Sequence, residues 1–273
     1  MMKIALNGAS GFVGTALQET FKNCVILDRH DDDELILHKL KDVDVVINLA
    51  GAPIIKRWSD PYKETLVRSR IDTTSQLVDV LNRSEVKHFI STSAIGIYPN
   101  DTPCDENCEQ RDDDFLTHLA QAWEDEALKC NKKTTILRFG IVLGKEGGAL
   151  AQMLPPFKLG LGGTIADGSM MTSWIHIKDL LRIYSFVINN ELEGTYNATA
   201  PHPVSNHTLT KTLGRCLHRP TLLPIPYFAL RLMYAEAASV LIDSKEVYPK
   251  ALLQAGFVFE YENIDTALQD ILA

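Results

Sequence analysis

The sequence lacks the features of a membrane protein or a nucleic-acid-binding protein. No run approaches the roughly 20 consecutive apolar residues that a membrane-spanning helix needs. Acidic residues outnumber basic ones by 35 to 27, and the net charge of −8 disfavours nucleic acid or an anionic membrane as the main partner. The first residues already read as a strand and a glycine loop, which leaves no room for a signal peptide. We therefore expect a cytoplasmic protein that acts on a small molecule.

Cysteine is also scarce, and its number is odd. The five cysteines lie at positions 24, 104, 108, 130 and 216. In a chain without a leader this predicts reduced thiols in the cytosol. Cys104 and Cys108 share an acidic loop, but no second Cys or His pair follows at metal-ligand spacing. We predict no metal site.

The strongest motif lies in the first fourteen residues, MMKIALNGASGFVG. An apolar strand over 3–7 precedes Gly8, Gly11 and Gly14, which have GxxGxxG spacing, and a helix is predicted to follow. Gly8 permits a sharp turn, Gly11 lets the backbone approach a pyrophosphate, and Gly14 lets the helix lie tight against the strand. The positive end of the helix dipole then faces the phosphates. The motif predicts dinucleotide binding.

Strand-like and helix-like segments alternate through the first half of the chain. The further predicted strands are 25–27, 44–49, 88–92 and 136–139, and the predicted helices are 13–22, 60–82 and 113–130. Such alternation is typical of an α/β fold with a doubly wound parallel sheet, whose carboxyl-end loops form one ligand crevice. Around the helix at 113–130, Asp112 to Asp114 are interpreted as capping charges.

The pattern changes at about residue 145. Gly-Gly pairs and Pro155-Pro156 interrupt the alternation, so that 145–170 is predicted to be an irregular insertion. A strand at 173–177 and a helix at 179–189 are predicted next, and prolines punctuate short helices after residue 201. We expect a dinucleotide-binding domain over 1–200 and a small, mostly helical lobe over 201–273 that covers the crevice.

Two features of the crevice bear on the choice of cofactor. Asp28 follows the second strand and would accept hydrogen bonds from ribose hydroxyls, favouring NAD, whereas Arg29 would pair with a 2′-phosphate, favouring NADP. The sequence therefore leaves NADP or NAD open. Small residues at 50–51 would let the backbone approach the cofactor. The residues predicted to contact the dinucleotide are Gly8, Ser10, Gly11, Phe12, Val13, Gly14, Asp28, Arg29, Leu49, Ala50, Gly51, Ser91 and Arg138.

Several sequence blocks resemble a known superfamily. GxxGxxG, NLAG at 48–51, ISTSA at 90–94 and SWIHIKDL at 173–180 are similar to the extended short-chain dehydrogenase/reductases, which include nucleoside-diphosphate-sugar epimerases. LRFGIVLG, MLPPFKLGLGG, NATAP and PKALLQAGF resemble an atypical, epimerase-like subfamily of unassigned substrate. The resemblance covers residues 3 to about 270. It implies a Rossmann-type domain with a small C-terminal substrate lobe and bound NADP or NAD.

The resemblance also shows which catalytic side chains are missing. In the superfamily a Ser positions the substrate, a Tyr transfers the proton, a Lys four residues later lowers the pKa of that Tyr, and an upstream Asn holds a water. Ser93 falls at the Ser position, where a substrate contact and a structural role are equally compatible. Leu116, Ala120 and Arg70 occupy the Tyr, Lys and Asn positions. Neither Leu nor Ala can move a proton.

Two residues could compensate for this loss. Arg70 would supply the positive charge of the missing Lys if it reaches the cofactor ribose, and Tyr98 would be the acid if a nearby cation lowers its pKa. The alternatives are a surface arginine and a buried aromatic. The cluster at 56–58 (Lys-Arg-Trp) would hold an anionic substrate or be a solvated loop, and for His176 with Asp179 we favour a framework role over an acid pair.

The residues thus support two main functions. The first is an NAD(P)-dependent oxidoreductase or epimerase that acts on a small polar substrate, nucleotide sugars included. The second is a binding protein that senses the redox state of the nicotinamide without turnover, which the absent Tyr and Lys favour. A structural or regulatory role rests only on fold-level analogy. The sequence leaves a homodimer open.

Overall fold

The computed structural model describes residues 2–273 and contains a parallel sheet of six strands. From one edge to the other the strands are β2 (Val25–Leu27), β1 (Ile4–Asn7), β3 (Val45–Asn48), β4 (His88–Ala94), β5 (Lys133–Phe139) and β9 (Gly194–Ala198). Four of the five strands predicted up to residue 139 match to within two residues at each end, and β5 begins three residues early. The chain leaves β1 toward β2 and then crosses to β3 on the other side, which makes the carboxyl ends of β1 and β3 the topological switch point.

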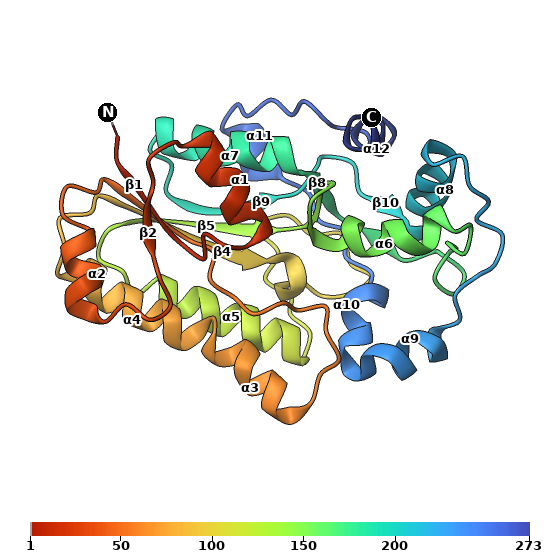
Figure 1. The fold of residues 1–273 in the computed structure, drawn as a ribbon, viewed down its shortest axis with the longest axis horizontal. Coiled ribbons are helices and arrows are strands. Elements are labelled where there is room, and N and C mark those ends of the chain that lie inside the picture. The colour runs from red at the N-terminus through yellow and green to blue at the C-terminus, as the bar shows by residue number, and fades with distance from the viewer. Residues whose placement is uncertain (1) are drawn as a thin grey trace.

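Helices cover both faces of the sheet, as the predicted doubly wound fold requires (Figure 1). One face packs against α1 (Phe12–Thr20) and α7 (Ile177–Asn189), and the other against α2 (Asp33–Lys39), α4 (Ile71–Asn82) and α5 (Phe115–Ala127). The burial of α7 follows helical periodicity, because its core residues recur three or four positions apart. These residues are Leu180, Ile183, Tyr184, Val187 and Ile188.

The remaining elements build the region beyond the sheet. They are η1 (Ile95–Ile97), β6 (Ile141–Leu143), α6 (Gly148–Lys158), β7 (Met171–Thr172), β8 (Trp174–His176), β10 (Val204–Ser205), α8 (Asn206–Cys216), α9 (Tyr227–Tyr234), η2 (Ala235–Ala238), α10 (Ser239–Ile242), α11 (Lys250–Gln254) and α12 (Ile264–Leu272). Two pairs of strands, β6 with β8 and β7 with β10, lie outside the main sheet. Helices α9 and α10 lie beyond the ends of α3 (Asp60–Arg68) and α5, whereas α11 returns to the vicinity of α7 (Figure 1).

The structure corrects two expectations about helices. The predicted helix over 60–82 is divided into α3 and α4, because the backbone turns at Ser69 and Arg70. The insertion at 145–170 is not irregular throughout, since α6 runs through Pro155 and Pro156. Both prolines lie in the last turn of that helix, whose apolar face (Leu150, Leu154, Phe157) is buried.

The prediction of five reduced thiols is wrong for one pair. Cys104 and Cys108 form a disulfide, and Cys24, Cys130 and Cys216 are free cysteines. A turn in which the Cys108 amide donates to the Asp105 carbonyl brings the two sulfurs together. Within residues 2–273, no helix has the length and apolar character needed to cross a membrane.

His176 and Asp179 have framework roles, as favoured above. His176 Nδ1 accepts a hydrogen bond from the Lys178 amide at 3.0 Å and caps α7, and its ring stacks on Tyr261. The Asp179 carboxylate is fully buried and accepts hydrogen bonds from the amides of Glu260 and Tyr261. It thereby fixes the C-terminal segment to α7.

The substitution Asp179→Ala should lower the free energy of unfolding by about 3 kcal/mol, because it leaves the amides of Glu260 and Tyr261 without an acceptor and Arg182 without its carboxylate partner. Urea denaturation measures the loss. The control is Asp265→Ala, which removes an exposed ion pair with Arg215 and should cost less than about 1 kcal/mol. Equal losses in the two variants would contradict this role of Asp179.

Candidate active site

The glycine loop forms a tight turn between β1 and α1. Gly8 has a φ of +85°, and a Cβ added there would lie 2.8 Å from the carbonyl carbon of Leu49. A Cβ on Gly14 would lie 2.4 Å from the Gly8 carbonyl oxygen. Both positions therefore require glycine, the first for its turn and the second for contact between helix and strand.

Gly11 differs from these two, because nothing in the protein crowds it. A Cβ added there would have one neighbour within 4 Å, the Gly8 oxygen at 3.5 Å. Gly11 is the exposed N-cap of α1, and no side chain of residues 2–273 caps this helix, so the positive end of its dipole has no side-chain partner. Ser10 is exposed, Val13 is half-buried, and the ring of Phe12 packs against the glycine loop at 144–148. The surroundings fit a phosphate group beside Gly11.

The carboxyl end of β2 carries the charges predicted to select the cofactor. Asp28 and Arg29 are both exposed. Asp28 Oδ1 accepts a hydrogen bond from the His30 amide at 3.1 Å. Arg29 makes no ion pair with any residue from 2 to 273.

Beyond β3, Arg70 lies directly beneath the backbone at Gly51. A Cβ on Gly51 would be 3.1 Å from the guanidinium carbon of Arg70, and this guanidinium donates to the Ala52 carbonyl at 3.0 Å and stacks on Trp123. Burial lowers the pKa of Arg70 to about 10, and no carboxylate of residues 2–273 pairs with it. A half-buried cation without a counter-ion among residues 2–273 favours an anionic ligand at the crevice.

Ser93 and Arg138 belong to one buried network. Ser93 on β4, Arg138 on β5 and Asn197 on β9 lie opposite one another in register. Ser93 Oγ donates to Glu124 of α5 at 2.6 Å, and Arg138 binds both oxygens of that carboxylate at 2.8 and 2.6 Å. Ser91 lies on β4 two residues before Ser93. It is fully buried, and its hydroxyl has no hydrogen-bond partner within residues 2–273.

Tyr98 completes this network and has no exposed surface. Its hydroxyl donates to Asn197 Oδ1 at 2.8 Å and accepts from Arg138 Nη1 at 2.7 Å. Arg138 is the nearby cation that the acid role of Tyr98 requires, but burial outweighs it and raises the pKa of Tyr98. The catalytic roles of Ser93 and Tyr98 stay predictions, and the geometry gives both hydroxyls structural partners.

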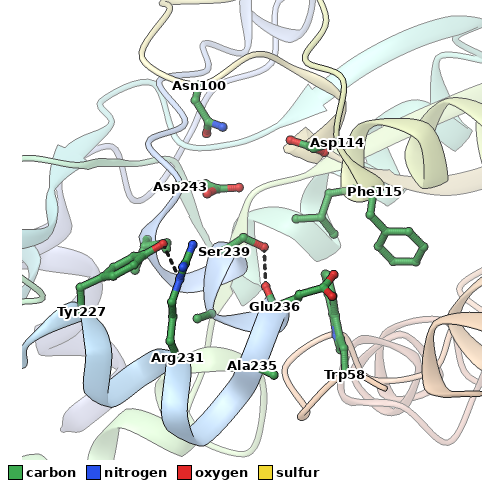
Figure 2. A pocket seen from close by; sticks show the side chains of 13 residues that line it. Trp58, Asn100, Asp114, Phe115, Tyr227, Arg231, Ala235, Glu236, Ser239 and Asp243 are labelled. Atoms are coloured by element: carbon green, nitrogen blue, oxygen red, sulfur yellow. Dashed lines mark hydrogen bonds between the residues drawn. The ribbon is translucent and has the colours of Figure 1, made fainter. Parts of the chain in front are cut away.

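A cavity of about 610 Å³ lies at the N-terminal end of α5. Leu116, at the position of the missing tyrosine, lines it together with Trp58, Asp114 and Asp243. Figure 2 shows that α5 contributes one side and the helical segment from Tyr227 to Asp243 the other. The predicted basic cluster is split here, since Trp58 faces the cavity and Arg57 binds the carbonyl of Leu232 at the end of α9.

Comparison with known proteins identifies the family. A family model described as the NAD dependent epimerase/dehydratase family matches residues 4–199. This chain belongs to that family. A second model, for a domain of unknown function (DUF1731), matches residues 225–271. The resemblance to an atypical, epimerase-like group of the extended short-chain dehydrogenase/reductases is confirmed.

Three relatives place the chain within the epimerase/dehydratase family. An epimerase family protein of Staphylococcus aureus (strain NCTC 8325 / PS 47) is 36% identical, with 100% of this chain and 99% of the relative covered. An SDR39U1 homologue from Arabidopsis thaliana, described as chloroplastic, is 33% identical over 99% of this chain and 87% of its own length. The crystal structure of human SDR39U1 (isoform 2) with NADPH is 28% identical, covers 99% of both chains and has a TM-score of 0.92.

Two residues near the predicted catalytic positions were not predicted from the sequence. Glu124 lies four residues after Ala120 on the same face of α5, and its carboxylate is buried against Arg138. Asp243 gave no signal, because only the folded chain brings it to the cavity beside Leu116.

Tyr98→Phe should lower the free energy of unfolding by about 1–3 kcal/mol, because it leaves Arg138 and Asn197 with unmatched groups in the core. The control is Tyr196→Phe, which removes a hydroxyl that donates to the Glu193 carbonyl near the surface and should cost less than about 1 kcal/mol. Chemical denaturation compares them. Full stability in Tyr98→Phe would show that the network does not hold this edge of the sheet.

Proposed function

We propose that this chain is an NADP(H)-dependent oxidoreductase or epimerase-like enzyme that acts on a small polar carbonyl compound in the cytoplasm. The observation that carries the proposal is the open cradle at Gly11, at the switch point of the sheet. A separate cavity is lined by Leu116, at the position of the superfamily's tyrosine. Ligands of open α/β sheets bind at such a switch point. The human relative with a TM-score of 0.92 was crystallised with NADPH.

The charges at the two ends of the crevice support NADP(H). In our proposal the amides that follow Gly11 bind the pyrophosphate, and Arg29 binds the 2′-phosphate of the adenosine ribose. Arg70 supplies positive charge beneath Gly51, close to the predicted path of the cofactor. When bound, the reduced nicotinamide supplies a hydride.

The alternative is a redox sensor that binds the dinucleotide without turnover. It is favoured by Leu116 and Ala120, which replace the Tyr and Lys of the superfamily. The size of the cavity, about 610 Å³, lies within the range of small-molecule sites and favours an enzyme.

The test is a fluorescence titration of the purified chain with NADPH and NADH, followed by a carbonyl panel with the cofactor that binds. The panel contains glyceraldehyde and phenanthrenequinone with the reduced cofactor, and UDP-glucose, whose alcohol groups would be oxidised, with the oxidised cofactor. Micromolar NADPH binding with turnover of one of these compounds supports the enzyme. Binding without turnover supports the sensor, and absence of binding overturns both.

Arg29→Ala should weaken NADPH binding about tenfold or more and leave NADH binding unchanged, because a charge-assisted hydrogen bond contributes about 1.5–3 kcal/mol. Parallel fluorescence titrations give both dissociation constants. Arg68→Ala, which removes another exposed cation far from the end of β2, is the control and should bind both cofactors normally. An equal loss for NADPH and NADH would refute recognition of the 2′-phosphate by Arg29.

Gly14→Ala should lower stability, whereas Gly11→Ala should lower the affinity for NADPH. At Gly14 the new Cβ collides with backbone, so the free energy of unfolding should fall by about 1–3 kcal/mol. At Gly11 there is space, so stability should change by less than about 1 kcal/mol while NADPH affinity falls at least about tenfold through crowding of the pyrophosphate. Urea denaturation and NADPH titration separate the two. Normal NADPH affinity in Gly11→Ala would place the pyrophosphate elsewhere.

A further inference from the structure

The cavity at the N-terminal end of α5 is lined by Asp243, an acidic residue that the family resemblance did not single out. Position 116, which carries tyrosine in the superfamily, lines this cavity with a leucine. The opposite wall comes from the segment that ends α10, and its last lining residue is Asp243. Trp58 and Phe115 give the cavity an aromatic side. Leu116 and Asp243 therefore line the same cavity from opposite walls.

Asp243 has an unengaged carboxylate. Within residues 2–273 it accepts no hydrogen bond and makes no ion pair within 4.0 Å, although the side chain is half-buried. Figure 2 shows the carboxylates of Asp243 and Asp114 pointing toward each other across the pocket. Asp114 is engaged, because its Oδ1 accepts the Thr117 amide at 2.8 Å and caps α5.

The surrounding charges make Asp243 easy to protonate. Burial is the main cause that raises the pKa of Asp243 to about 6; the Lys245 ammonium lowers this pKa, and the carboxylates of Asp114, Asp112 and Asp101 raise it. Lys245 also donates to the Tyr98 carbonyl and lies 3.9 Å from Asp112. The other charged groups on the cavity wall have partners, since Arg231 binds the Tyr227 hydroxyl and Glu236 pairs with Lys63.

We propose that Asp243 is the catalytic acid–base residue that transfers the proton in place of the absent tyrosine. The proposal rests on the proposed function and adds the identity of its proton donor. In the reducing direction the substrate carbonyl carbon accepts a hydride from the reduced nicotinamide, and the π electron pair of the C=O bond moves to the oxygen. The O–H bond of the Asp243 carboxyl breaks, and its proton goes to that oxygen. The products are an alcohol, oxidised nicotinamide and the Asp243 carboxylate, which takes a proton from water before the next turnover.

The test compares Asp243→Asn with Asp114→Asn under single-turnover conditions, with bound NADPH and phenanthrenequinone as the probe carbonyl. In the wild type the rate should fall as pH rises through about 6, because the acid must be protonated. Asp243→Asn should lose about 100-fold or more of this rate and the pH dependence, with unchanged NADPH affinity. Asp114→Asn keeps a good helix cap but removes a like charge, so it should move the fall in rate to lower pH.

A second readout does not depend on turnover. Carboxyl ¹³C NMR of the NADP⁺-loaded protein should show one aspartate that titrates near pH 6, absent in Asp243→Asn and shifted to lower pH in Asp114→Asn. Wild-type turnover that persists in Asp243→Asn, or an Asp243 carboxyl that titrates below about pH 4.5, would overturn the proposal while leaving the proposed function intact. A wild type that binds NADPH and does not reduce the probe overturns Asp243 as proton donor, and absence of NADPH binding overturns the proposed function itself.

Discussion

The carboxyl edge of the sheet depends on one buried ion pair, that of Glu124 with Arg138. It joins α5 to β5 through two charge-assisted hydrogen bonds, and Ser93 on β4 and Tyr98 after η1 bind to the same two side chains. Removing either charge would leave the other buried and unpaired, at a cost of about 3–5 kcal/mol. Ser93, at the position of the serine that orients substrate in the superfamily, therefore hydrogen-bonds to this ion pair, and its catalytic role stays a prediction.

The same helix bears on where the proposed proton transfer would take place. Leu116, Ala120 and Glu124 are spaced four residues apart and form one stripe of α5. Leu116 lines the cavity, Ala120 packs into a small apolar core, and Glu124 holds Arg138. A lysine at the position of Ala120 would have to enter that core, where its charge would be removed from water. In our proposal, proton transfer therefore falls to Asp243 on the facing wall of the cavity.

The parts of the fold that follow from local pattern could be predicted from the sequence. Parallel strands buried on both faces give short apolar runs, and glycines at fixed spacing mark the turn at the switch point, so both were found. The break at Arg70 could not be seen, since it depends on a guanidinium that folds back to Ala52 and Leu66. Asp243 was missed for a related reason. It lies in a short segment without periodicity, and its surroundings come from the loop and helix start at 100–114.

The position of Asp243 is tied to the edge that the ion pair stabilises. The segment that follows Asp243 runs along this edge. There the Lys245 ammonium donates to the Tyr98 carbonyl and the Val247 amide donates to Ser173 Oγ at 2.8 Å. The Cys104 amide donates to the Glu246 carbonyl at 2.9 Å, so the disulfide loop holds the same segment from its other side. Lys245 is 7% exposed and partly balances the carboxylates around the cavity, which keeps their charge tolerable in the folded state. The segment that carries Asp243 is thus hydrogen-bonded to the sheet edge that Glu124 and Arg138 stabilise. We therefore expect a substitution in that buried network to shift Asp243, the proposed proton donor, as well.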